Sequence, residues 1–193
     1  ISMLNRRLAE LAKKENAPFT DASASASENF DLFRSASIDV NCKPEQWTAA
    51  LAVGDPELRR ALEHGFSAAE LHEVVASYLN GLDQSVKSAS TRHSDRLANE
   101  IAEGILHREV FTTPAAEQAL YAPDLAKLTV DDCLAALRKT FSAPGRYVLV
   151  AGNAKIPGDA NAAIAAAYAQ SQQVAVAAPA AAAEQKWAYT DFG

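Results

Sequence analysis

The spacing of apolar residues changes near Thr20 from a helical period to a period of two residues. This change constrains the fold of the chain more than any other feature of its sequence. Leucines recur at helical spacing from Leu4 to Leu11, and Pro18 disfavours a helical residue before it, so a helix is predicted over residues 2–15. From Asp21 to Ser27, alanine alternates with serine and aspartate, which predicts a strand with one face of alanine alone. Such a face suits close passage of a helix backbone.

A second alternation follows and predicts a partner strand, with a turn at Glu28–Asn29. Arg34 interrupts its apolar face, either as an end residue whose guanidinium reaches water or as a charge that faces a cavity. The apolar positions of this second strand are Phe30, Leu32, Ala36, Ile38, Val40 and Cys42.

Helix signals dominate the rest of the chain. Pro44 begins a helix that is predicted to end near His64, with a break allowed at Gly54–Pro56, and Gly65 closes it. Ser67 and Glu70 have the spacing of a capping box, in which the serine hydroxyl and the glutamate carboxylate each accept a free backbone N–H. The box predicts a further helix that runs to about residue 82.

Four later helix starts are expected near Ser94, at Thr113–Pro114, at Thr129 and at Asp159. A short apolar run at Tyr147–Ala151 predicts a buried strand. The helix from Ser94 is expected to turn four residues inward: Leu97, Ile101, Ile105 and Leu106.

Composition agrees with a helix-rich domain. The hydrophobic fraction is 49%, much of it alanine, and only 7% of residues are aromatic, so small side chains are expected at the contacts. We predict an α+β fold in which several helices pack on one face of a small, mainly antiparallel β-sheet whose first strand or strands lie outside this sequence. The domain is expected to span 1–172, followed by an Ala/Pro/Val interdomain linker at 173–185 and the first strand of another domain at 186–193. The predicted core comprises Leu8, Leu32, Ile38, Leu58, Leu62, Leu71, Val75, Leu79, Ile101, Leu134, Leu137, Val148 and Val150.

Charge and cysteine usage exclude several classes of protein. The net charge is −6 with scattered lysines and arginines, which argues against a nucleic-acid partner. No apolar run approaches the roughly 18 residues of a membrane helix and no signal-peptide pattern opens the chain, so we expect a soluble protein without a membrane partner. Cys42 and Cys133 show no metal-binding spacing and are interpreted as buried thiols.

The residues provide no recognisable catalytic centre or metal site. A zinc peptidase helix carries two histidines one turn apart beside a glutamate, whereas His64, His72, His93 and His107 are dispersed. Glu103 and His107 lie one turn apart and could share a metal ion, but this spacing is common on solvated helices. Serine-hydrolase and phosphate-binding patterns are also absent.

Several short motifs taken together resemble the M16 zinc peptidases, the pitrilysin and insulinase group. The resemblance covers Leu4–Ser90 well, is extended by residues 128–153, and includes residues 186–193 as the start of a following domain. The motifs are Leu4-Asn5-Arg6-Arg7-Leu8-Ala9-Glu10-Leu11, Ala17-Pro18-Phe19, Glu57-Leu58-Arg59-Arg60-Ala61-Leu62, His64-Gly65-Phe66 and Glu70-Leu71.

This resemblance implies the second, non-catalytic α/β domain in the N-terminal half of a protease whose four related domains enclose a chamber. The zinc motif HxxEH of the family lies in the first domain and is absent here, so zinc is expected in the parent protein and not in this chain. The substrate-holding arginine and tyrosine of the family's second half correspond to Ala12 and Phe19, so that role does not carry over. Arg34 is the candidate substrate contact, other domains of the same polypeptide and a peptide substrate are the implied partners, and the periplasm is the favoured compartment.

Two hypotheses follow from the resemblance. In the first, the chain forms part of the wall of the chamber of an active peptidase, and another domain supplies zinc. In the second, it belongs to a catalytically inactive M16-like scaffold or assembly subunit. A helix at residue 2 and a strand that stops at Gly193 favour the first hypothesis, because both ends look excised.

Overall fold

The computed structural model describes residues 1–29 and 32–179. In this part the chain forms seven α-helices and one two-stranded antiparallel sheet, as expected for the predicted α+β class. Short 3-10 turns at Pro44–Gln46 and Ala89–Thr91 precede two of the helices. The elements are α1 Ser2–Ala12, β1 Asp21–Asn29, β2 Phe33–Asn41, α2 Trp47–His64, α3 Ala68–Lys87, α4 Ser94–His107, α5 Pro114–Leu125, α6 Val130–Thr140 and α7 Ala160–Gln172.

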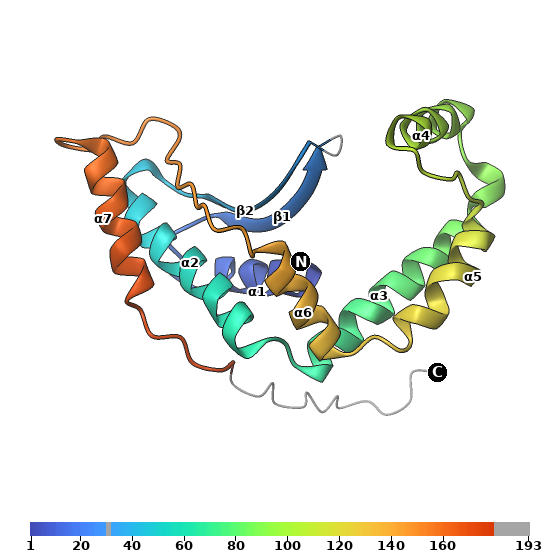
Figure 1. The fold of residues 1–193 in the computed structure, drawn as a ribbon, viewed down its shortest axis with the longest axis horizontal. Coiled ribbons are helices and arrows are strands. Elements are labelled where there is room, and N and C mark those ends of the chain that lie inside the picture. The colour runs from blue at the N-terminus through green and yellow to red at the C-terminus, as the bar shows by residue number, and fades with distance from the viewer. Residues whose placement is uncertain (30–31, 180–193) are drawn as a thin grey trace.

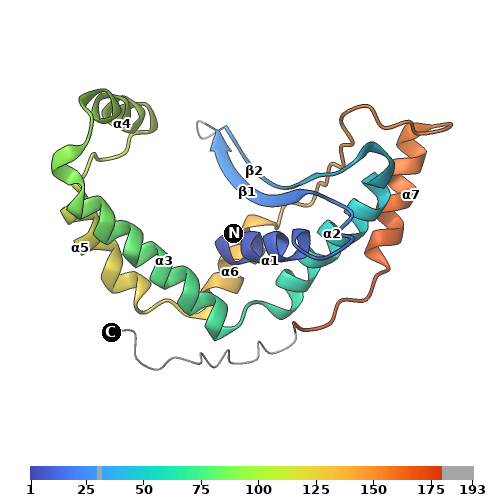
Figure 2. The same cartoon turned by 180° about the vertical axis from the view of Figure 1, so that it is seen from behind.

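The hairpin rests on two helices that cover one of its faces. Helix α1 packs on β1 and α2 packs on β2, and both lie on the same side of the hairpin in the two opposite views (Figure 1 and Figure 2). Ala24 of β1 is buried against this layer, and the Asn5 side chain of α1 bonds directly to its backbone. The predicted alanine face therefore permits the close helix approach that the sequence indicated.

Helix α2 passes equally close to β2. A Cβ atom on Gly54 would lie 3.1 Å from Val40 Cγ2 and 3.8 Å from Ile38 Cγ2, so glycine lets the two backbones approach. The break allowed at Gly54–Pro56 does not occur, and α2 is continuous through Pro56. Residues 54–58 are all buried, and this packing offsets the roughly 3 kcal/mol that an interior proline costs a helix.

The core forms where α1, α2, α3 and α6 meet beneath β1. Four predicted core residues, Leu8, Leu58, Leu71 and Leu137, are buried there, while Ile38, Leu62 and Val75 pack against the cluster. Leu79 and Leu134 are half-buried. The buried cluster consists of Met3, Leu4, Leu8, Ala24, Leu58, Ala61, Phe66, Leu71 and Leu137.

Predicted helix starts are confirmed by side-chain caps. Ser67 and Glu70 form the capping box of α3, and Thr129 begins α6 with a second box completed by Asp132. The Asp159 carboxylate accepts two backbone N–H groups at the start of α7. Each cap satisfies amides that a helix leaves without internal partners.

The turn of the hairpin lies later than predicted. Glu28 and Asn29 are the last residues of β1, and the ladder continues to the pair Asn29–Phe33. Leu32, predicted in the core, is 81% exposed in the turn; Phe30 lies outside the described residues. The prediction was wrong because two further pairs, Glu28–Arg34 and Asn29–Phe33, extend the ladder past the predicted turn, and Arg34 forms an ion pair with Glu28 across the strands.

The apolar residues of α4 do not face a core. Helices α3 and α5 lie side by side and form an arm, at whose end α4 lies (Figure 1). Ile101, Ile105 and Leu106 are exposed, with Ile105 at 75%, so the inward orientation predicted for them was wrong. A helical period identifies an apolar face but does not supply a partner for it.

The run at Tyr147–Ala151 has no regular secondary structure and is not a strand. Tyr147 and Leu149 are 85% and 67% exposed, whereas the predicted core residues Val148 and Val150 are half-buried and lie outside the core cluster. The strand prediction was wrong because a strand requires a hydrogen-bonded neighbour, and none is present among the described residues.

Candidate functional site

The four histidines of the chain are dispersed over α2, α3 and the two ends of α4. Within residues 1–29 and 32–179, no three His, Cys, Asp or Glu side chains lie close enough to hold a metal ion. His107 Nε2 lies 3.5 Å from Glu103 Oε2 on α4, and His64 Nε2 lies 3.2 Å from the Val176 carbonyl oxygen. His72 and His93 are exposed on α3 and at the start of α4.

The two cysteines are free and half-buried. Burial raises the pKa of the Cys133 thiol, which disfavours the thiolate that nucleophilic catalysis requires. Cys133 also packs against the hydrophobic core. Its place in the fold is therefore structural.

A cavity of about 1090 Å³ lies between β2, α2 and the segment 139–154. Its lining includes Ile38 and Val40 from the strand, Leu51 from the helix and Val148 from the segment. These side chains make its walls largely apolar. Charged side chains such as Lys139 and Arg146 also line it, so apolar and charged groups meet at this cavity.

Arg34 is one of the residues that line this cavity. Its Nε donates to Glu28 Oε2 at 2.9 Å and its Nη2 donates to Glu28 Oε1 at 3.0 Å, so the guanidinium is held in a two-point ion pair. Arg34 is the second residue of β2 and its side chain is 74% exposed, and it is also among the residues that line the cavity, so both sequence-based alternatives stay open. Contact between Arg34 and a substrate stays a prediction.

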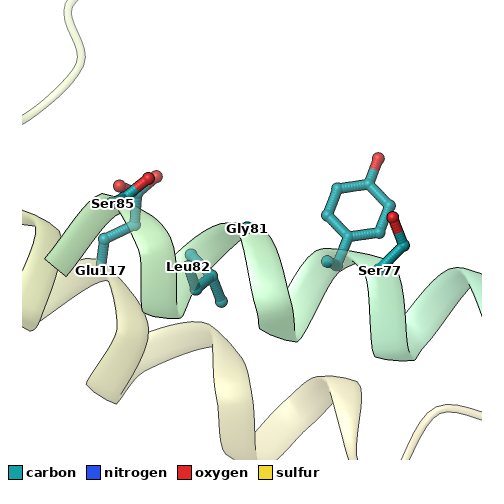
Figure 3. Close-up of a pocket in the computed structure, with 6 residues that line it drawn as sticks. Ser77, Gly81, Leu82, Ser85 and Glu117 are labelled. Carbon is teal, nitrogen blue, oxygen red and sulfur yellow. The ribbon is translucent and has the colours of Figure 1, made fainter. Parts of the chain in front are cut away.

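A second, smaller pocket of about 310 Å³ lies between α3 and α5 (Figure 3). Its lining offers hydroxyl groups from Ser77 and Ser85 and one carboxylate, Glu117. No histidine or lysine lines this pocket to activate a hydroxyl.

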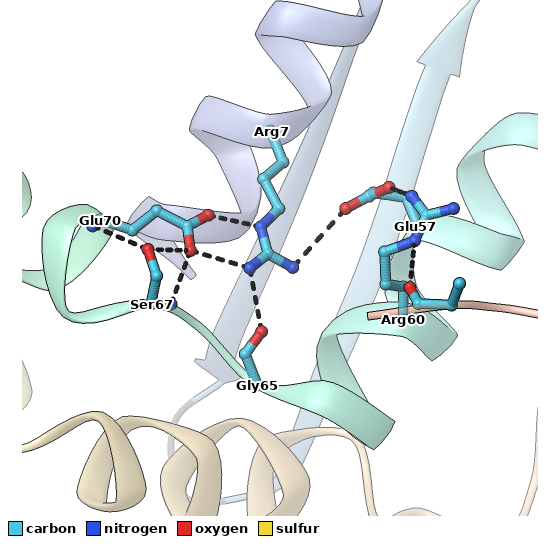
Figure 4. Close-up of polar contacts among 7 residues, drawn as sticks. Arg7, Glu57, Arg60, Gly65, Ser67 and Glu70 are labelled. Carbon is cyan, nitrogen blue, oxygen red and sulfur yellow. Dashed lines mark hydrogen bonds and ion pairs between the residues drawn. The ribbon is translucent and has the colours of Figure 1, made fainter. Parts of the chain in front are cut away.

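The M16-like motifs meet at the side chain of Arg7 (Figure 4). Its Nε donates to Glu70 Oε1 at 2.5 Å, and its Nη2 donates to Glu70 Oε2 and to the Gly65 carbonyl oxygen, both at 2.9 Å. The guanidinium carbon also lies 4.8 Å from the centre of the Phe66 ring. One arginine on α1 therefore fixes the turn between α2 and α3.

Glu57 completes this cluster from α2. Its Oε1 lies 3.8 Å from Arg7 Nη1, it also pairs with Arg60, and its side chain is 4% exposed. Burial raises the pKa of Glu57 against the opposing effect of Arg60 and Arg7. Burial alone would also raise the pKa of Glu70, but the hydrogen bonds from Arg7 and Ser67 prevail and lower it.

A second polar cluster ties α7 to α2. The buried Asp55 carboxylate accepts from Ser171 Oγ at 3.0 Å, Gln172 Nε2 at 2.6 Å and Arg59 Nε at 3.2 Å. Arg59 Nη2 donates in turn to the Ser171 carbonyl oxygen at 2.7 Å. This cluster holds the last helix of the described chain in place.

Comparison with solved structures shows which proteins share this fold. The first half of the periplasmic protease PqqL from Escherichia coli matches 93% of this chain at 21% identity and a TM-score of 0.76, and 39% of that structure is covered. The complete PqqL protease matches 99% of this chain at 20% identity and a TM-score of 0.73, with 22% of it covered. A predicted insulinase family protease from Yersinia pestis matches 88% at 20% identity and a TM-score of 0.70, with 37% covered.

The chain has the fold of part of an M16 insulinase-family protease. It spans between 22% and 39% of these three structures. No protein-family model matches the sequence, and no curated protein does. None of the helices in the described ranges is long and apolar enough to cross a membrane.

In this M16 fold the segment after α7 runs along α2. Arg59 Nη2 donates to the Val174 carbonyl oxygen at 2.8 Å and Arg60 Nε donates to that of Ala177 at 3.1 Å. These residues belong to the predicted linker 173–185, of which the structure describes residues 173–179, and the predicted strand at 186–193 lies outside the described residues. Arg59 and Arg60, both in the Glu57–Leu62 motif, therefore hold the chain against α2 where it leaves α7. The spacing of these residues in the sequence did not indicate this role.

Proposed function

We propose that this chain is a non-catalytic, chamber-forming domain of an M16-like zinc metallopeptidase. The observation that carries the proposal is the match of 93% of the chain to the first half of a periplasmic protease at a TM-score of 0.76. The motifs that suggested the family also pack together around Arg7. Their shared role is to fix three helices relative to one another.

The chemistry of the proposed peptidase belongs to another domain. Zinc that activates water needs three protein ligands converging on one point, and the described residues do not fit this requirement because no three His, Cys, Asp or Glu side chains among them lie close enough together. In the proposal, the HxxEH motif lies elsewhere in the protein. This chain then contributes to enclosure of the peptide, with Arg34 as a candidate contact.

The proposed partners are the other domains of the same polypeptide and a peptide substrate. Proteases of this fold are several times longer than the chain, which supports a multidomain parent. The proposed compartment is the periplasm, because the matched PqqL protease is periplasmic.

Cleavage of a quenched fluorescent peptide by the complete natural protein tests this proposal. We expect cleavage that a chelator abolishes and added zinc restores, because metal-bound water is the nucleophile in such enzymes. The isolated chain of residues 1–193 should show no cleavage under the same conditions. Inactivity of the zinc-loaded complete protein would contradict the proposal and favour an inactive scaffold subunit.

A further inference from the structure

Residues 174–177, which we call the strap, follow α7 and are bound to α2 at both ends. Arg59 Nη2 donates to the Val174 carbonyl oxygen at 2.8 Å, and Arg60 Nε donates to the Ala177 carbonyl oxygen at 3.1 Å. The first and the last residue of the strap therefore contact the same helix through charged donors. Hydrogen bonds from charged groups are the stronger ones in proteins.

His64 adds a third bond to the strap. Its Nε2 lies 3.2 Å from the Val176 carbonyl oxygen. Because a carbonyl oxygen only accepts hydrogen bonds, the imidazole ring donates from Nε2. All three donors to the strap lie in the last two turns of α2.

The contact reads the backbone of the strap and not its side chains. The strap has the sequence Val-Ala-Val-Ala, whose side chains carry no hydrogen-bonding group. All three bonds from α2 end on main-chain carbonyl oxygens. The surface of α2 is therefore built to hold an extended chain of small apolar residues.

The donors are fixed independently of the strap. Arg60 also pairs with the buried Glu57 (Figure 4), and Arg59 Nε donates to the buried Asp55 at 3.2 Å. A guanidinium that is already held in place loses less conformational entropy when it binds a further acceptor. The strap thus docks on a prepared surface.

We propose that this docking moves the joint between the present domain and the next part of the protein to a point after Ala177. The predicted linker begins at residue 173, but the strap belongs to the domain as long as α2 holds it. Its release would add four residues, about 13 Å of reach, to the joint. This consequence for a following domain rests on the multidomain parent of the proposed function.

The strap can open while the domain stays folded. Only Val176 of its four residues is half-buried, and the other three are exposed. Opening therefore uncovers little apolar surface and requires less free energy than global unfolding. Three hydrogen bonds from α2 then decide how much of the time the strap is docked.

Limited proteolysis of the complete natural protein by elastase, which cleaves after alanine and valine, tests the proposal. Zinc is chelated throughout, and mass spectrometry identifies the new chain ends. His64→Leu should speed cleavage within the strap about 5-fold, because cleavage follows the population of the open segment. Adding Arg60→Lys, which keeps a cation beside Glu57 but lacks the Nε donor, should raise the factor to about 10 or more.

Two further variants serve as controls. His64→Gln should restore most of the protection, because its side-chain amide can donate to the same carbonyl oxygen. His72→Leu, which replaces an exposed histidine on α3, should leave cleavage within the strap unchanged.

Two results would overturn the proposal. Equal cleavage within the strap in the natural protein and in the double variant would mean that α2 does not hold it. Acceleration by His72→Leu as large as that by His64→Leu would mean that the domain loosens generally. The measurement requires neither zinc nor peptidase activity, so its failure is distinct from a failure of the proposed function.

Discussion

Arg7 is the side chain on which α1, α2 and α3 converge. It contacts Glu57, Glu70 and the Gly65 carbonyl oxygen while its own side chain is 11% exposed. The sequence presented these residues as separate short motifs, and their resemblance to a family indicated that they belong together. The cluster itself was not predicted, because Arg7 and Glu57 are far apart in sequence and only packing unites them.

Replacement of Arg7 by methionine should lower the free energy of unfolding by about 3 kcal/mol, because it leaves the buried Glu57 with one partner fewer and removes the bonds to Glu70. Urea unfolding of the isolated chain measures the change. The matched control is Arg6→Met, which removes an exposed ion pair with Glu73 and should cost less than about 1 kcal/mol. Equal costs at the two positions would contradict the assigned role of Arg7.

The raised pKa of Glu57 predicts a pH dependence of stability. A carboxyl whose pKa is raised above its ordinary 4.5 in the folded state favours folding when protonated, so its contribution falls as the pH rises from 4.5 through the raised value. The stability of the natural chain relative to Glu57→Gln should therefore decline across that window. Unfolding in urea from about pH 4 to about pH 7 measures this difference, and a constant difference would refute the expectation.

At the scale of elements, the starts of helices were the features that the sequence predicted best. Capping boxes at Ser67 and Thr129 mark helix starts in both sequence and structure, because a cap depends on residues three positions apart. Partners of extended segments were not predictable. Tyr147–Ala151 has the composition of a strand but no neighbour among the described residues, and α4 has an apolar face without one.

Two glycines test how closely α2 approaches β2. Gly81 of α3 has open space where a Cβ would lie, so Gly81→Ala should stabilise the chain by up to about 1 kcal/mol through helix propensity. Gly54→Ala should not, because its methyl group would lie 3.1 Å from Val40 Cγ2. Gly54→Val should destabilise by about 1 to 3 kcal/mol through overpacking, and Gly81→Val serves as its control. Thermal unfolding distinguishes the pairs, and equal effects at both positions would disprove the close approach.

At the scale of the whole molecule, two polar clusters make a framework from separate helices. The Arg7 cluster joins α1, α2 and α3, and the Asp55 cluster adds α7. The hairpin and the cavity beside it lie on this framework. This fixed arrangement of helices is what the proposed role as a chamber wall would require, and within residues 1–29 and 32–179 no three His, Cys, Asp or Glu side chains lie close enough to hold a metal ion.

Measurement of zinc content by elemental analysis tests the central claim most directly. It is made on the isolated chain and on the complete natural protein after the same zinc loading and dialysis. The account predicts one zinc ion for each complete protein and no stoichiometric zinc in the chain, because the ligands lie in another domain. Stoichiometric zinc in the isolated chain, or its absence from the complete protein, would contradict the account.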